Sequence, residues 1–272
     1  MNEKLIEAVR FYEGDVSGDD PFWSDPKAYV TLNSLLFPGI ENETLRSAEG
    51  KRLNGAMLED TGRLLGIYED LLDACSLCAL KAPEKVWRVE RFSDYELCRR
   101  EGRTISFTST STAGFLGRYG DKFGLAVMAF DLPAGTPCIS FAEVLPEYAK
   151  ADEAEILLPP WLDLEFEERA PEGEELSVRD MKDEPPRVFV HVKAKPFGQG
   201  SLTGKIASRS SYKEEVLPDP SGAAAGQRVY ACLNRKEEPD PADADAFSRW
   251  KDRLQEQVRK MVLDKFRCTD RE

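Results

Sequence analysis

Two acidic residues in the middle of the chain are the first candidates for catalysis. Glu153 and Glu155 stand two positions apart, immediately before the apolar run at residues 156–158. Residues at this spacing in a strand point to the same face, so we expect both carboxylates at the mouth of a strand that enters the core. The ordinary interpretation of two acids in a chain this acidic is a solvated face. The alternative is a pair that performs acid–base chemistry.

Two polar features precede this pair. Arg88 lies inside an otherwise apolar, strand-like segment, and Ser109, Thr110 and Ser111 form a polar segment of high strand propensity. A single arginine on a strand is most often a surface ion pair of small energetic consequence. A Ser-Thr-Ser segment alone is most often an edge strand or a turn. Each feature taken singly therefore predicts no function.

Composition and charge limit the possible partners. The chain has 272 residues, with 50 acidic and 37 basic side chains and a formal net charge of −13. This charge argues against nucleic acids and anionic membranes, which bind clustered Lys and Arg. No apolar run reaches about 18 residues, and Glu7, Arg10 and Glu13 interrupt any signal-peptide core. We expect a protein of the producing cell's cytoplasm, or one delivered into a target cell without a conventional signal peptide.

Cysteine and histidine usage bears on metal and redox chemistry. The six cysteines are too few and too scattered for a disulfide scaffold, so reduced thiols are expected. Cys75 and Cys78 fall on the apolar face of a predicted helix, where core packing is the interpretation preferred over a zinc or redox half-site. His191 is the sole histidine and alternates with apolar neighbours. A structural role is expected for it, and no metal site is predicted.

Apolar periodicity predicts helices at both ends of the chain and strands between them. Spacings of three and four over residues 57–78 and 247–261 predict amphipathic helices. Short apolar or alternating runs predict strands at 86–89, 104–108, 125–130, 155–158, 162–166, 188–192 and 228–233. This arrangement predicts an α+β fold with a mostly antiparallel sheet. The expected domains are a helical region at 1–82 packed on the core, a core at 83–235 with a flexible excursion near 196–226, and a C-terminal helix within 236–272.

The chemistry-bearing residues acquire meaning when they are taken in chain order. They are Arg88, then Ser109, Thr110 and Ser111, then Glu153 and Glu155 followed by Ile-Leu-Leu-Pro. This order resembles the Arg–Ser–Glu signature of ADP-ribosyltransferases, in the branch of clostridial binary-toxin enzymes and arginine-specific mono-ADP-ribosyltransferases. The separations, 109 − 88 = 21 and 155 − 109 = 46 residues, are compatible with it. The resemblance covers roughly residues 84–195 and implies a split antiparallel β sandwich with an N-terminal helical region.

The resemblance also implies a role for each motif residue, with NAD as the substrate. Glu155 would stabilise the oxocarbenium-like ribosyl group through a ribose hydroxyl. Ser109 would orient Glu155, and Arg88 would grip the diphosphate with its charged fork. Glu153 would position the acceptor and remove its proton, which a guanidinium needs before its nitrogen can attack.

Further residues are assigned to binding on the same basis. Ser109, Thr110, Ser111 and Arg118 are expected to contact NAD. In the family, the loop before the Glu-x-Glu strand contacts the protein target, and Tyr148 would be the aromatic contact here. An exposed loop tyrosine without a function is the alternative for Tyr148.

These observations predict a mono-ADP-ribosyltransferase, a toxin or effector that moves ADP-ribose from NAD to a protein side chain. Arginine is the expected acceptor, because the motif begins with Glu153. A protein substrate from a host or competitor is the expected partner. The alternatives are an NAD glycohydrolase, transfer to threonine, serine, asparagine or a nucleic-acid base, and a catalytically silent NAD-binding module.

Overall fold

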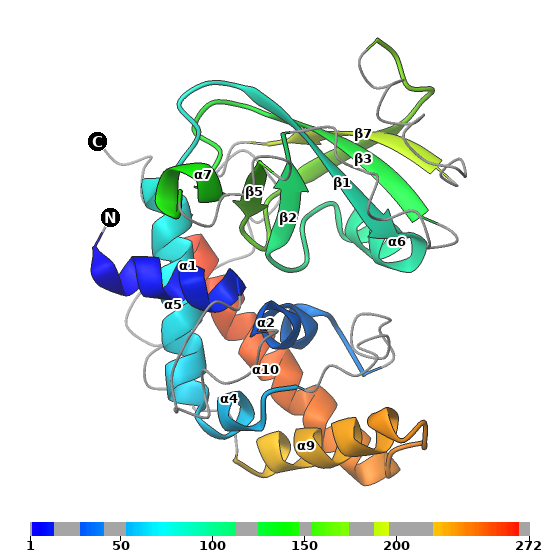
Figure 1. Ribbon diagram of the computed structural model, residues 1–272. Coiled ribbons are helices and arrows are strands. Elements are labelled where there is room, and N and C mark those ends of the chain that lie inside the picture. The colour runs from blue at the N-terminus through cyan, green and yellow to red at the C-terminus, as the bar shows by residue number, and fades with distance from the viewer. Residues whose placement is uncertain are drawn as a thin grey trace. The chain divides into compact units, whose positions relative to one another are not determined.

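The computed structural model describes residues 2–13, 28–40, 53–112, 125–146, 154–173, 188–195 and 220–266. The chain divides into two compact units, which are treated separately below (Figure 1). The helical unit comprises Met1–Asp73 and Gly204–Lys265, and the sheet unit comprises Ala74–Thr203 and Phe266–Glu272. The N-terminal helices therefore share a unit with the C-terminal ones.

The helical unit confirms helices at both ends of the chain. Its elements are α1 (Glu3–Glu13), α2 (Ala28–Leu36), α4 (Gly55–Glu59), α5 (Thr61–Leu77), α9 (Pro220–Asn234) and α10 (Pro241–Phe266), of which α5 and α10 end in the sheet unit. The apolar spacing over 247–261 lies in α10, where Phe247, Trp250, Leu254 and Val258 are fully buried. The periodic residues thus form the buried face of that helix.

The strand predicted at 228–233 is wrong, because these residues belong to helix α9. The same helix includes residues 220–226, which the sequence placed in a flexible excursion. Two glycines explain the error. A Cβ atom at Gly222 would lie 2.5 Å from the Cβ atom of Trp250, and one at Gly226 would lie 2.6 Å from the Phe247 ring. These glycines allow α9 to approach α10 closely, and alanines between them favour a helix.

A lysine is buried in the helical unit. Lys251 on α10 has no exposed surface, and its Nζ donates a hydrogen bond to the carbonyl oxygen of Gly39 at 2.8 Å. Burial disfavours its charged form and lowers the pKa of Lys251 to about 7. The stability of this unit should therefore depend on pH.

The sheet unit confirms the α+β fold class. Its elements are β1 (Glu84–Arg91), α6 (Phe92–Glu101), β2 (Thr108–Ser111), β3 (Leu125–Leu132), β4 (Ile139–Ser140), α7 (Phe141–Val144), β5 (Glu155–Leu158), β6 (Leu164–Glu168) and β7 (Val188–Ala194). The strands form a seven-stranded sheet in the order β4-β5-β2-β1-β3-β7-β6. All pairs between described strands are antiparallel except β3–β7. The strand expected at 104–108 begins only at Thr108.

The seven strands fall into two groups that meet at one place. β1 pairs with β3 along its whole length, from Glu84↔Leu132 to Arg91↔Leu125. Between β1 and β2 the described register holds the single pair Trp87↔Ser111. The groups β4-β5-β2 and β1-β3-β7-β6 therefore meet at this seam within one seven-stranded sheet.

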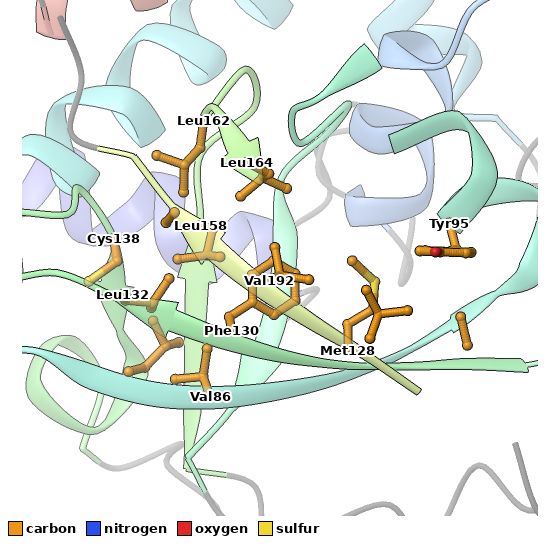
Figure 2. Packing of buried hydrophobic residues seen from close by; sticks show 14 residues of the cluster. Val86, Tyr95, Met128, Phe130, Leu132, Cys138, Leu158, Leu162, Leu164 and Val192 are labelled. Carbon is orange, nitrogen blue, oxygen red and sulfur yellow. The ribbon is translucent and has the colours of Figure 1, made fainter. Parts of the chain in front are cut away.

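Both faces of the central strands are buried. One face forms the larger core with Tyr95 of α6, and Figure 2 shows Val86, Met128, Phe130, Leu158 and Val192 gathered there. The other face buries Trp87, Val127, Ala129 and Phe189. Burial on both faces explains why β3 is apolar at every position except Asp131.

The lone histidine and Cys75 of α5 have structural surroundings. His191 on β7 is buried, and its Nε2 lies 2.7 Å from an Oδ2 of Asp131 on the neighbouring strand β3. Cys75 is fully buried, and burial raises the pKa of its thiol well above the ordinary value. Both findings agree with the structural roles expected from the sequence.

Candidate functional site

Strand β2 connects the three motif segments, because it lies between β1 and β5 in the sheet. Its antiparallel register with β5 pairs Ser109 with Leu157 and Ser111 with Glu155. Register partners project to the same face, and so do residues two apart on one strand. Ser109, Ser111 and Glu155 therefore share one face of the sheet, together with Trp87 of β1.

Ser111, rather than Ser109, is the direct cross-strand neighbour of Glu155. Directly opposed residues have Cβ atoms about 5 Å apart, whereas a diagonal neighbour such as Ser109 lies about 7–8 Å away. The sequence placed Ser111 only among the NAD-binding residues. Its proximity to Glu155 depends on the pairing register, which the motif spacing does not specify. The orienting role expected of Ser109 stays a prediction.

Thr110 points to the opposite face and holds β2 against β5. Its side chain is buried, and its Oγ1 donates a hydrogen bond to the carbonyl oxygen of Ile156 at 2.7 Å. This bond accounts for a polar side chain in an apolar core. The contact with NAD expected of Thr110 stays a prediction.

Arg88 binds the backbone of β2 through its guanidinium group. Its Nη1 donates to the carbonyl oxygen of Ser109 at 2.6 Å, two positions along β2 from the seam. The side chain retains 27% of its exposure. Strand alternation places Arg88 on the α6 face, whereas Glu155 belongs to the other face. The structure thus brings both residues to β2 but does not place their side chains on one face.

Glu90 is a partner of Arg88 that the sequence analysis did not identify. Its Oε2 accepts hydrogen bonds from Arg88 Nε at 2.6 Å and lies 2.5 Å from Nη2. Its Oε1 accepts the backbone N–H of Arg91 at 3.0 Å, at the start of α6. Two charged residues of opposite sign at i and i+2 on a strand were the available signal.

Helix α6 lies close to this ion pair. Cys98 of α6 has its thiol pKa raised to about 12, first by burial and then by the negative charge of Glu90, while Arg88 acts in the opposite direction. Glu90 and Arg88 therefore lie close enough to α6 for their charges to affect the Cys98 thiol. The Arg88 and Glu90 side chains are largely shielded from water, and this shielding strengthens the attraction between them.

The backbone changes direction immediately before Glu155. Ala154 has a φ of 38°, a left-handed value that is uncommon for a residue with a Cβ atom. Its carbonyl oxygen accepts the N–H of Thr112 at 3.1 Å, and β5 begins only at Glu155. The strand alternation that predicted a common face for Glu153 and Glu155 therefore does not extend through Ala154. Backbone strain of this kind is concentrated at functional sites.

Three predicted site residues lie outside the described residues: Glu153, Arg118 and Tyr148. Their roles stay predictions. Across the described ranges, no group of three or more His, Cys, Asp or Glu side chains is arranged to hold a metal ion. A helix of the length and apolarity needed to cross a membrane is likewise not found in those ranges.

The chemistry available at β2 is that of a charged fork, hydroxyl groups and a carboxylate. A guanidinium held in a fixed plane suits an anion with paired oxygens, such as a diphosphate. A carboxylate beside hydroxyls suits a sugar hydroxyl or a developing positive charge. The residue types on and beside β2 are therefore ones that can contact a phosphate and a sugar, and they lie on two faces of the sheet.

Several solved structures are similar to the chain. Plx2a, an ADP-ribosyltransferase toxin from Paenibacillus larvae, is 11% identical, with 72% of this chain and 87% of that chain covered at a TM-score of 0.42. The catalytic domain of VahC from Aeromonas hydrophila is 17% identical, with 72% and 100% covered at 0.43. The ADP-ribosylating toxin BECa of C. perfringens, solved with NADH, is 11% identical, with 71% and 44% covered at 0.44.

No protein-family model and no curated protein matches the chain. With identities and TM-scores this low, the similarity to solved structures assigns no activity and no residue role to the chain.

Proposed function

We propose that the chain is an NAD-dependent mono-ADP-ribosyltransferase that modifies a protein side chain. The observation that carries the proposal is the convergence of three motif segments on β2. Arg88 binds the Ser109 carbonyl from one side, and Glu155 is the register partner of Ser111 on the other. Residue types that suit a diphosphate and a ribose therefore adjoin one short strand.

The proposed reaction breaks the bond between nicotinamide and ribose C1′. The nicotinamide nitrogen leaves with the bonding electron pair, so positive charge develops on the ribose. The role proposed for Glu155 is to stabilise that charge with its carboxylate, and Ser111 and Ser109 would fix the orientation of the carboxylate by hydrogen bonding. Arg88 would hold the diphosphate in place while the ribose moves toward the acceptor.

Arginine is the proposed acceptor. A guanidinium nitrogen would form the new bond to C1′ and release one proton. Glu153 is the residue proposed to accept this proton, because it lies two residues before Glu155, the first residue of β5. The acidic charge of the chain suits a basic protein target.

The experiment is incubation of the full chain with labelled NAD and a cell lysate, with detection of labelled proteins and free nicotinamide. Glu155→Gln removes the charge at nearly constant volume, and Glu165→Gln on β6 is a matched control at an exposed acid. We expect a discrete labelled protein with wild type and Glu165→Gln, and none with Glu155→Gln.

Other outcomes of the same experiment separate the alternatives. Nicotinamide release with no labelled protein would favour an NAD glycohydrolase. Label on threonine, serine or asparagine would correct the acceptor alone. Binding of NAD without turnover would indicate a silent module and contradict the proposed enzyme.

A further inference from the structure

We propose that Glu90 is a positioning residue that holds the Arg88 guanidinium in the orientation that receives the diphosphate of NAD. This inference rests on the function proposed above and adds a residue to it. It concerns how Arg88 is fixed before substrate arrives, and it depends on contacts that lie on β1 and at the start of α6.

The contacts of Glu90 fix the plane of the guanidinium. One oxygen, Oε2, engages both Nε and Nη2 of Arg88, while Nη1 donates to the Ser109 carbonyl. Contacts on three different nitrogens of one planar group leave it little freedom to rotate. Glu90 supplies two of these described contacts.

Glu90 is itself held in place. Its second oxygen accepts the backbone N–H of Arg91, and its side chain is only 15% exposed. Because the Arg91 N–H belongs to the backbone, its position does not change with a side-chain rotamer. The Glu90 carboxylate that it binds is therefore held in a fixed position beside Arg88. An arginine side chain that is free to rotate loses considerable entropy when it is ordered. A guanidinium that is ordered beforehand spares the ligand that cost.

If charge alone were considered, Glu90 would be expected to have the opposite role and to compete with the substrate for Arg88. A carboxylate near a bound diphosphate repels it. The Arg88 guanidinium and the Arg91 N–H already balance the negative charge of the Glu90 carboxylate. The bond to the Arg91 backbone also keeps this carboxylate in its place beside Arg88. We therefore expect orientation to outweigh repulsion.

The test measures the affinity of the full chain for ADP-ribose, which carries the diphosphate and has no nicotinamide bond to break. The variants are Glu90→Ala, Glu90→Gln and the control Glu168→Ala. Glu168 accepts a hydrogen bond from Tyr95 at 2.8 Å and lies 2.9 Å from Arg99, so its removal takes a comparable carboxylate away from α6. Thermal unfolding of every variant reports on the fold.

We expect Glu90→Ala to raise the Kd for ADP-ribose about 10-fold, a change worth about 1.4 kcal/mol. Glu90→Gln keeps one oxygen acceptor, so its Kd should fall between those of Glu90→Ala and wild type. Glu168→Ala should bind as wild type does, even if its unfolding temperature falls. In a folded Glu90→Ala variant, affinity equal to that of the control would overturn the inference, because the pair would then be only structural.

Two further results would contradict either the positioning role of Glu90 alone or the proposed function together with it. Tighter binding by both Glu90 variants would mean that Glu90 competes with the ligand, which contradicts the positioning role but leaves the proposed function intact. Failure of the wild-type chain to bind either ADP-ribose or NAD would overturn the proposed function and this inference together.

Discussion

Ser111 and Glu155 are register partners on the adjacent strands β2 and β5, so a hydroxyl and a carboxylate project side by side from one face of the sheet. Because the serine is small, the longer glutamate extends past it. A carboxylate placed in this way can touch a ligand while its neighbour restricts its orientation. This geometry leads to two predictions about the site.

Glu155→Gln should abolish both ADP-ribosyl transfer and NAD hydrolysis. The amide has nearly the same shape but no charge to stabilise the ribosyl group, so kcat should fall by about 100-fold or more. Nicotinamide release, quantified by chromatography, measures it. Full activity in a folded Glu155→Gln variant would remove Glu155 from the mechanism.

Serine-to-alanine variants should separate the two hydroxyls. Ser109→Ala should lower kcat by about 10-fold, since it removes an orienting group rather than a charge. Ser111→Ala should lower it at least as much, because Ser111 lies directly opposite Glu155. Steady-state kinetics with both variants provides the comparison. Equal activity in wild type and both variants would mean that neither hydroxyl orients the carboxylate.

Glycine substitutions should test the contact between α9 and α10. Gly226→Ala would place a Cβ atom 2.6 Å from the Phe247 ring, so it should lower the free energy of unfolding by about 1–3 kcal/mol. Gly66 in α5 has no atom within 4 Å of an added Cβ. Gly66→Ala should therefore raise stability by about 0.5–1 kcal/mol through helix propensity. Urea unfolding measures both, and a stable Gly226→Ala variant would contradict this helix packing.

Lys251 should make stability rise with pH above neutrality. Its folded pKa of about 7 lies below its unfolded value, so the unfolded chain binds more protons between about pH 7 and 10. The penalty for burying the charge is complete below about pH 7 and disappears as pH rises through this window. Unfolding temperatures from pH 6 to 9, for wild type and Lys251→Met, measure it. The variant should lack this rise, and parallel curves would show that Lys251 does not titrate in the window.

The sequence was most informative where local patterns decide the structure. The apolar spacing over 247–261 correctly gave α10, and the residues after Glu155 correctly gave a buried strand. In both segments burial follows directly from periodicity or from a continuous apolar run. The α+β class followed from the same patterns.

Contacts between distant segments were harder to predict. Gly222 and Gly226 suggested a loop because a glycine's usual signal is flexibility, whereas here glycine permits contact between helices. The pairing of Ser111 with Glu155 depends on register, which shifts every partner if it slips by one residue. The left-handed Ala154 carries no sequence signal, since alanine is ordinarily a helix former.

Because the two strand groups meet at one seam, a ligand bound at Arg88 should also affect residues of β2 that it does not contact. The described register pairs β1 with β2 at Trp87↔Ser111. The hydrogen bond from Arg88 to the Ser109 carbonyl is an additional connection between these two strands. A ligand that engages the guanidinium therefore acts on the attachment of β2 as well. Occupancy of the site should be visible as altered deuterium exchange along β2, including at amides that the ligand never touches. Substitution of Arg88 should therefore weaken the attachment of β2 to β1 as well as the binding of substrate proposed for this residue.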